Sequence, residues 1–293
     1  MIDRIGELLK LLDLERLEDN LFRGQSRDIG APQVFGGQVL GQALVAATRT
    51  VDGRLVHSLH AYFLRRGDVN APIVFEVDRS RDGGSFTSRR VVAIQHGQPI
   101  LTMSASFQIV EPGLDHQSVM PQVPPPEELR DVGEVNEALL ERVPEKVRSF
   151  FRHHRPFEFR AVDPPDWLNP VMREAAKQVW FRVPARLADD QPLHRCLLAY
   201  VSDYHLLDTA AMPHGVSFLE LQLASIDHAI WFHRELRVDD WLLYVIESPS
   251  ASGARGFSRG SVYTRDGRLV ASVAQEGLIR QHSRWNNPAG RQK

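Results

Sequence analysis

The pattern of apolar and polar positions divides the chain into two stretches with the same series of elements. Each stretch offers one apolar helix followed by strands in which apolar and polar positions alternate. The first stretch predicts helices Met1–Leu14 and Gln38–Thr50, and strands Leu21–Gln25, Ser58–Arg65, Ile73–Arg79, Ser88–Gln95 and Ile100–Ile109. The second predicts helix His194–Met212, and strands Gln178–Val183, Gln222–His233, Trp241–Ser248, Gly256–Thr264 and Leu269–Ile279.

The two stretches also align residue by residue. His60-Ala61 matches His228-Ala229 at an offset of 168 residues, and Arg90 matches Arg259 at an offset of 169. A repeat of this length indicates two copies of one domain. One long helix followed by antiparallel strands predicts an α+β layer, with the sheet wrapped over the helix. At the offset of 168, His57 falls opposite Ser225, so His57 could border a second, degenerate site in the first domain.

Proline marks the region between the copies. Ten of the 18 prolines lie between Pro112 and Pro170, which excludes long regular elements there. We expect a first domain over residues 1–115, a proline-rich linker over 116–154 with a short helix near Glu134–Glu141, and a second domain over 155–293.

Two polar residues interrupt otherwise apolar faces of the second domain. Asp203 lies within a predicted helix that is apolar nearly all round from Cys196 to Leu207, as expected of a buried helix. Gln275 is the polar residue on a strand face that otherwise carries Leu269, Ala271, Val273, Gly277 and Ile279. Buried polar side chains need partners, so the two residues either satisfy each other and nearby helix ends or serve a function.

Composition narrows the class of protein. The chain is 43% hydrophobic and 25% charged, with a net charge of −2, which predicts no nucleic-acid partner. Cys196 is the single cysteine, which fits a reducing compartment. No stretch approaches the roughly 18 apolar residues of a membrane span, and the start of the chain is not a secretory signal. We therefore expect a cytoplasmic protein.

Several longer segments resemble one known family. They are Leu21–Gln25, Val34–Val39, Val56–Arg65, Ser202-Asp203, Ile226–Arg234 and Ala271–Gly277. Together they resemble the acyl-CoA thioesterase II family, whose members have two fused hotdog domains. The resemblance implies a hydrolase of fatty acid metabolism that cleaves medium- to long-chain acyl-CoA to fatty acid and coenzyme A, without a cofactor. It implies a catalytic trio of Asp203, Ser225 and Gln275, although Ser225 replaces the family's usual threonine.

The chemistry of these residue types fits hydrolysis by an activated water. Asp203 can accept a proton as a general base, and the side chains of Ser225 and Gln275 can hold the water in line with the carbonyl carbon. By analogy with the fold, the oxyanion is expected at backbone N–H groups near a helix N-terminus, around Gly36-Gly37 or its counterpart in the second domain. Arg255 and Arg259 could meet the phosphates of coenzyme A, or they could belong to a solvated loop.

Other interpretations remain open at this stage. His57, His60, His228 and His233 do not have a metal-ligand spacing, and we expect no metal. A covalent serine mechanism is not expected, because the Gly-x-Ser-x-Gly sequence at Gly256–Gly260 falls within the predicted strand Gly256–Thr264 and not at a strand-to-helix turn. A hotdog enoyl-CoA hydratase or dehydratase, and a non-catalytic acyl-CoA binding module, are the alternative functions. Because hotdog sheets present long edges, we also expect a homo-oligomer, either a dimer or a tetramer.

Overall fold

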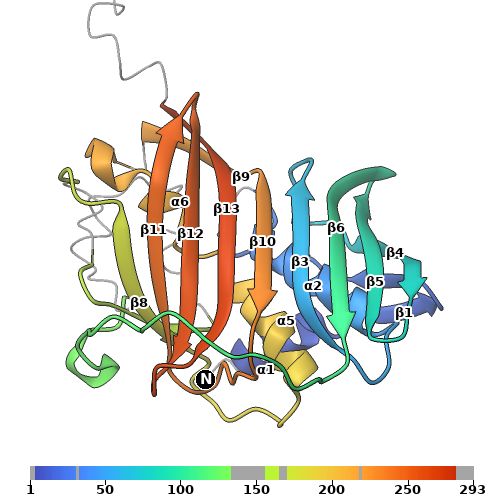
Figure 1. Ribbon diagram of the computed structural model, residues 1–293. Helices are drawn as coiled ribbons and strands as arrows, with labels where there is room; N and C mark the ends of the chain where they lie inside the picture. The colour runs from blue at the N-terminus through green and yellow to red at the C-terminus, as the bar shows by residue number, and fades with distance from the viewer. Residues whose placement is uncertain (1–3, 31–32, 133–155, 165–169, 218–219, 282–293) are drawn as a thin grey trace, which may run out of the picture.

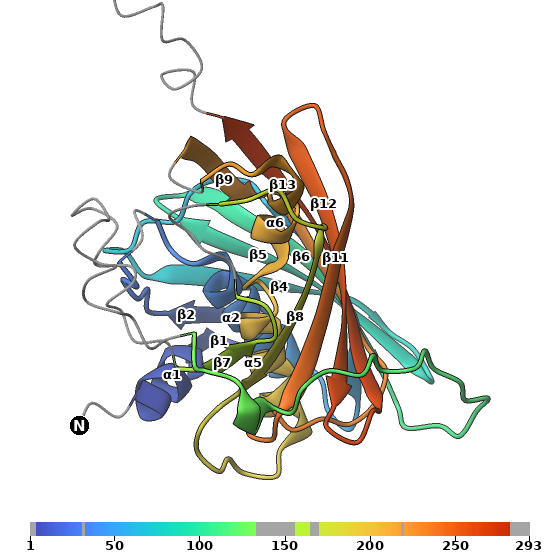
Figure 2. The same cartoon turned by 90° about the vertical axis from the view of Figure 1, so that its left-hand side faces the viewer.

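A computed structural model describes residues 4–30, 33–132, 156–164, 170–217 and 220–281. The expected short helix near Glu134–Glu141 lies outside these residues. Strands dominate the fold, and the helices lie on one side of them (Figures 1 and 2). The helices are α1 (Arg4–Leu12), α2 (Gly36–Thr48), α5 (Gln191–Val201) and α6 (Leu206–Thr209), with 3₁₀ turns at Pro126–Glu128 and Met212–His214. The strands of the first half are β1 (Glu15–Glu18), β2 (Leu21–Gly24), β3 (Leu55–Phe63), β4 (Ile73–Asp82), β5 (Phe86–Gln95) and β6 (Gln98–Gln108). Those of the second half are β7 (Glu158–Ala161), β8 (Ala176–Arg182), β9 (Leu221–Ser225), β10 (Asp227–Phe232), β11 (Leu242–Ser252), β12 (Arg255–Thr264) and β13 (Leu269–Gln281).

All thirteen of these strands form one antiparallel sheet. Its order is β1-β2-β4-β5-β6-β3-β10-β13-β12-β11-β8-β7, with β9 attached to β13. The two halves of the chain meet where β3 pairs with β10, in a register that places Leu59 opposite Ile230. The sheet is therefore continuous across both halves, and its long central strands lie side by side in Figure 1.

The two central helices pack against each other on one side of this sheet. Both are largely buried, as expected from their apolar sequences. Glycine permits the close approach at the start of α2, because a Cβ atom at Gly37 would lie 2.1 Å from the backbone oxygen of Tyr200. The N-terminus of α2 is therefore held against the C-terminal end of α5. The helix was predicted to begin at Gln38. It begins at Gly36, so both glycines form its first turn.

The structure aligns the strands β3 and β10 at an offset one residue larger than the 168 residues of the sequence match between His60 and His228. In the first half, the backbone N–H groups of Leu64 and Arg65 both donate to Ile100. In the second half, those of His233 and Arg234 both donate to Val270. Alternation of buried residues agrees, because Leu59, Ala61 and Phe63 face the helices as His228, Ile230 and Phe232 do. The counterpart of Ser225 is thus Val56, and the expected alignment with His57 is wrong by one residue.

Two predicted elements of the second half are broken, and both breaks lie next to polar residues. The helix predicted over His194–Met212 ends at Val201 and resumes only at Leu206, with His205 between them in the left-handed region at φ 70°. Asp203 therefore lies in a turn and not in the middle of a helix. The strand predicted over Gln222–His233 is divided at Ile226 into β9 and β10.

The segment after β6 crosses the outer face of the second half, opposite the helices. It is the green trace that passes in front of the lower strand ends in Figure 1. Pro124 accepts a hydrogen bond from the indole of Trp180, Ser118 pairs with the hydroxyl of Tyr263, and Glu127 forms an ion pair with Arg265. This segment covers a small apolar cluster made by Trp180, Trp241, Leu243 and Tyr263.

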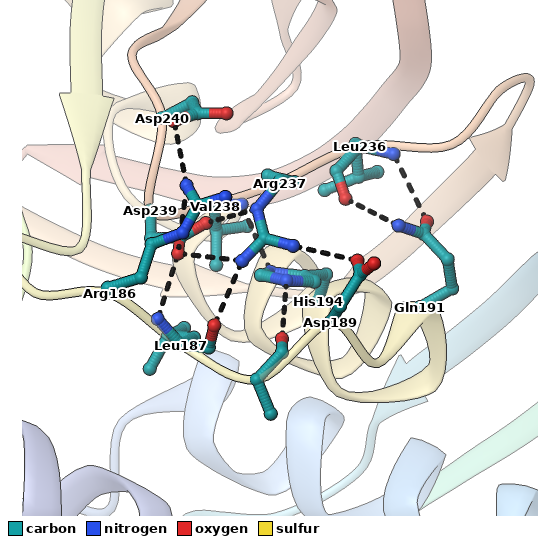
Figure 3. Close-up of polar contacts among 11 residues, drawn as sticks. Arg186, Leu187, Asp189, Gln191, His194, Leu236, Arg237, Val238, Asp239 and Asp240 are labelled. Carbon is teal, nitrogen blue, oxygen red and sulfur yellow. Dashed lines mark hydrogen bonds and ion pairs between the residues drawn. The ribbon is translucent and has the colours of Figure 1, made fainter.

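A polar network fixes the N-terminal end of α5 (Figure 3). The buried His194 accepts a hydrogen bond from the backbone N–H of Val238 and pairs with the backbone oxygen of Ala188. Gln191 exchanges two hydrogen bonds with the backbone of Leu236. Nearby, Arg237 forms an ion pair with the fully buried carboxylate of Asp239 at 2.9 Å. These contacts tie the loop before α5 to the loop after β10, so the helix that leads to Asp203 is held at its start.

Candidate active site

Asp203 lies between the C-terminal end of α5 and the N-terminus of α2. Its side chain is only 5% exposed, and its Oδ2 accepts a 2.9 Å hydrogen bond from the backbone N–H of Gly37. A Cβ atom at Gly36 would lie 2.8 Å from the same oxygen, so a larger residue there would push the carboxylate away. The partial positive charge of a helix N-terminus stabilises an anion at this position. Both glycines that the sequence analysis had placed near the site contribute to it.

Ser225 and Gln275 both meet Asp203 at its other carboxylate oxygen. The hydroxyl of Ser225 donates to Oδ1 over 3.2 Å, and Nε2 of Gln275 donates to it over 2.6 Å. Gln275 projects from β13 toward the helices and is 2% exposed. The structure therefore brings together the three residues expected to act together, although they lie far apart in the sequence.

The break between β9 and β10 positions Ser225. Along β13, Gly277 pairs with Ser225 and Ala274 pairs with Ala229, so four residues advance on one side against three on the other. Such a bulge inserts one residue and redirects the strand. The backbone N–H of Glu276 donates to the side chain of Asp227 within this bulge. The irregularity lets Ser225 reach Asp203 while β10 continues toward the seam between the halves.

His228 is a member of this cluster that the sequence analysis did not assign to it. It is 1% exposed, its Nδ1 lies 3.2 Å from Nε2 of Gln275, and its Nε2 lies 2.9 Å from the hydroxyl of Ser202. Burial lowers the pKa of His228 to about 4, although the nearby Asp203 opposes this shift. The imidazole is therefore neutral near pH 7. The sequence signal was the alternation that places His228 in line with Ile230 and Phe232.

Two further polar side chains lie around the cluster. The hydroxyl of Tyr244 donates to the backbone oxygen of Ser202 over 3.1 Å. Burial raises the pKa of Tyr244 well above its ordinary value, and the charge of Asp203 adds to this shift. Among the described residues, Oε1 of Gln275 and the hydroxyl of Ser258 are buried without a hydrogen-bond partner. These two residues face each other on paired strands.

Apolar and aromatic residues surround the carboxylate. The ring of Phe63 lies close to Gly36, because a Cβ atom added there would be 3.2 Å from it and would also meet Asp203. Phe35 packs against Tyr200 and Tyr204 with ring centroids 5.2 and 4.5 Å apart. Asp203 is thus the charged group of a largely apolar region, where electrostatic interactions are stronger than in water.

His57, Arg255 and Arg259 lie away from this cluster. His57 pairs with Ser106 at 2.8 Å and packs against Phe86, so it projects from the outer face of the sheet. Burial lowers its pKa, as does the charge of Arg195. Arg255 and Arg259 form exposed ion pairs with Glu276 and Glu247, respectively. They belong to β12 of a long hairpin and not to the solvated loop that the sequence analysis left open.

Three further observations concern the rest of the described structure. Over the described residues, no group of three or more His, Cys, Asp or Glu side chains could hold a metal ion. No helix within the same ranges is both long and apolar enough to cross a membrane. A cleft of 690 Å³ lies at the other end of α5 beside Arg237 and Trp241, and none of the candidate site residues lines it.

Comparisons with known proteins point to one family. The family model for the acyl-CoA thioesterase N-terminal domain matches residues 24–108, and the acyl-CoA thioesterase family model matches residues 150–278. Acyl-CoA thioesterase 2 of Haemophilus influenzae is 42% identical over 96% of this chain and 99% of its own. Human acyl-coenzyme A thioesterase 8 is 42% identical over 92% of this chain and 88% of its own.

Solved structures extend the comparison to the fold. An acyl-CoA thioesterase II of Mycobacterium marinum is 46% identical, with a TM-score of 0.78 over 94% of this chain and 98% of its own. A protein from Alicyclobacillus acidocaldarius described as having a hotdog fold is 20% identical, with a TM-score of 0.76 over 94% of this chain and 98% of its own. The fold is therefore that of hotdog proteins. The chain belongs to the acyl-CoA thioesterase II family of thioester hydrolases.

Proposed function

We propose that this chain hydrolyses medium- to long-chain fatty acyl-CoA, using one water held by Asp203, Ser225 and Gln275, without an acyl-enzyme. The observation that carries the proposal is the meeting of Ser225 and Gln275 on a single oxygen of Asp203, at 3.2 and 2.6 Å. A carboxylate held by neutral donors stays available as a base, and the donors fix its direction.

The proposed reaction has two steps. The water oxygen attacks the thioester carbonyl carbon while Asp203 takes one of its protons. The tetrahedral intermediate then collapses with cleavage of the C–S bond, and the proton held by Asp203 passes to the departing sulfur. The products are a fatty acid and coenzyme A. Because both N–H bonds of Gln275 point to Asp203 and His228, its Oε1 is the atom that can accept a hydrogen bond from the water.

The N-terminus of α2 supplies positive potential for both charged species of this reaction. The N–H of Gly37 donates to Asp203. The same helix terminus lies beside the proposed site of attack, so its dipole also favours the oxyanion of the intermediate. The backbone around Gly36 and Gly37 is thus the proposed place where the oxyanion is stabilised.

The apolar surroundings support a fatty acyl substrate. Phe35, Phe63, Tyr200 and Tyr204 lie beside the carboxylate, and none of them offers a charge to select a polar acyl group. Free-thiol release should therefore rise as the acyl chain of a CoA series lengthens from short to medium and long. Release only from short polar acyl-CoA would contradict this substrate class.

The coenzyme A part of the substrate has weaker candidates. Arg255 and Arg259 are exposed cations on the outer face, and each would have to exchange Glu276 or Glu247 for a phosphate. His57, which is half-buried on the outer face, remains a candidate for substrate contact. Charge-removing variants of the two arginines should raise the KM for acyl-CoA without changing its kcat.

A covalent alternative can be tested directly. If Ser225 attacked the thioester, rapid mixing would give a burst of thiol release, and mass spectrometry of the quenched enzyme would find an acylated peptide containing Ser225. We expect neither signal, because Ser225 is the last residue of strand β9 and does not stand on a strand-to-helix turn. A trapped acyl-Ser225 adduct would overturn the water mechanism.

We further propose two tandem hotdog domains, over residues 1–115 and 155–293, with 116–154 as the linker. The matching registers of β3 with β6 and of β10 with β13 support this division.

Exposed Tyr62 and Trp231 on the outer face favour a homo-oligomer, whose size light scattering would give. The single buried Cys196, whose pKa burial raises to about 12, fits the proposed cytoplasmic location.

A further inference from the structure

A chain of hydrogen bonds runs from the last turn of α5 to Asp203 through His228. The hydroxyl of Ser202 donates to the backbone oxygen of Ala199 over 3.1 Å and lies 2.9 Å from Nε2 of His228. On the other side of the ring, Nδ1 of His228 lies 3.2 Å from Nε2 of Gln275, which donates to Asp203 over 2.6 Å. All these side chains except that of Asp203 are at least 98% buried, so each hydrogen must find an acceptor here.

The number of available hydrogens fixes which group donates and which accepts in each of these hydrogen bonds. The amide nitrogen of Gln275 has two hydrogens and no acceptor capacity, so Nδ1 of His228 must accept. The ring hydrogen then sits on Nε2 and points to Ser202, whose own hydrogen points to Ala199. The opposite arrangement would rotate the amide by half a turn and place Oε1 of Gln275 about where Nε2 now lies, 2.6 Å from the carboxylate of Asp203. Two acceptors at that distance repel each other.

From this geometry we infer that His228 is a positioning residue, which holds the side-chain amide of Gln275 in the one orientation that serves Asp203 and the water. With both N–H bonds engaged, the amide plane cannot rotate, and Oε1 keeps a fixed place. Without His228, one N–H bond to Asp203 remains, and the amide can turn about it. The inference rests on the proposed role of Gln275, through which His228 acts.

Burial outweighs the negative charge that faces His228, so Nδ1 of the ring stays an acceptor. Among charged side chains, that of Asp203 faces the ring, with Oδ1 3.9 Å from Nδ1 of His228. The hydroxyl of Tyr244 donates to the backbone oxygen of Ser202, next to the ring. A protonated ring would place an N–H against the N–H of Gln275 and break the chain. Burial keeps the ring neutral around pH 7.

The first half of the protein suggests which variants of His228 to compare. Leu59 occupies the corresponding position of the first half and is fully buried there, so the fold accommodates leucine at this point. His228→Leu removes the acceptor at nearly constant volume. His228→Asn retains an oxygen near the position of Nδ1 and loses the contact with Ser202. Each variant should be made in the parent enzyme and in Gln275→Ala, with kcat, KM and Tm measured on a long-chain acyl-CoA.

If His228 acts through Gln275, His228→Leu lowers kcat about tenfold with little change in KM, as for one lost hydrogen bond. His228→Asn retains kcat within about threefold, and His228→Leu has no further effect in Gln275→Ala. Equal losses of kcat in both backgrounds, or unchanged kcat in His228→Leu, would overturn the inference. A fully active Gln275→Ala would instead show that the proposed site itself is wrong. Should His228→Leu fail to fold, Ser202→Ala takes its place in the same cycle, with a smaller loss confined to the parent background.

Discussion

The two halves of the sheet place different side chains at corresponding positions beside their central helices. Strand pairing matches four polar residues of the second half with apolar ones in the first. The pairs are Ser225 with Val56, His228 with Leu59, Gln275 with Ala105, and Tyr244 with Phe75. The same backbone arrangement therefore carries an apolar core in one half and a hydrogen-bonded cluster in the other.

One pair departs from this rule. Ser258, whose hydroxyl has no partner among the described residues, corresponds to Arg89 in the first half. Arg89 is 2% exposed and donates to both the side chain and the backbone of Thr50, which follows α2. The first half thus uses its buried polar group to fix a helix end. Buried polar groups are costly, and the proposed catalytic role gives a reason for the second half to retain its cluster.

The largest expected effect concerns Asp203, for which the first half offers a control. Asp203→Asn keeps the shape of the side chain but removes the base, so kcat should fall by about 10²–10⁴. Asp52 also follows the central helix of its half, but it is exposed, and Asp52→Asn should be as active as the parent. Steady-state thiol release checks both. Equal activity of Asp203→Asn and the parent would remove the distinction between the halves.

A second expected difference is in stability against pH. Folding lowers the pKa of His228 from 6.5 to about 4, so between these values the unfolded chain binds a proton that the folded protein does not. The resulting contribution to the free energy of unfolding is complete above pH 6.5, falls as the pH falls, and is lost below pH 4. Its size is about 3 kcal/mol.

His228→Leu, which copies the first half, should lose this dependence. Denaturant unfolding of the parent and the variant at a series of pH values gives the difference directly. The parent curve should fall more steeply toward acid than the variant curve. Parallel curves would mean that His228 has the same affinity for protons in the folded and unfolded chains.

Gln275→Ala introduces the residue that the first half has at Ala105. It removes positioning but leaves the base, so kcat should fall about 10- to 100-fold, which is less than for Asp203→Asn. Gln42 is the matched control, because it is a fully buried glutamine that serves the backbone of Leu11 and Gln25. Gln42→Ala should lower Tm while kcat stays within about threefold. A reversed order of these two effects on kcat would argue against the proposed site.

The smallest expected effect lies at Ser225, whose contact with Asp203 is the longer of the two, at 3.2 Å. Ser225→Ala should lower kcat by about tenfold or less, since one hydrogen bond is lost. Ser225→Thr keeps the hydroxyl and restricts its rotamer, so its kcat should equal or exceed that of the parent. Steady-state kinetics on a single acyl-CoA ranks the three proteins. A threonine variant less active than the alanine variant would contradict a role for the hydroxyl.

Periodicity alone predicted most of the sheet and both buried helices. It could not predict the break after α5, because Tyr204, Leu206 and Leu207 continue the apolar pattern through a turn in which His205 takes a left-handed conformation. The two short edge strands were also missed. Strand β1 is exposed at every position and carries no alternation, whereas β7 alternates over only four residues.

The site was predicted in part. Asp203 and Gln275 stood out as polar residues in apolar surroundings, and Ser225 came only from the family resemblance. The bulge at Ile226 could not be read from single residues, and a one-residue error in the repeat offset placed His57, in place of Val56, opposite Ser225. Hydrogen-bond direction, on which the role of His228 depends, is a property of assembled geometry and has no signature in sequence.

The contact between the start of α2 and the end of α5 has a consequence for how the enzyme responds to dilution. Gly36, Gly37 and Phe63 come from the first half, whereas Asp203, Ser225 and Gln275 come from the second. Because one polypeptide supplies both groups, they meet at an effective concentration that the covalent connection sets. The assembly of this site within a chain does not weaken as the enzyme becomes scarce. Two separate single-domain proteins would need to find each other before either could act.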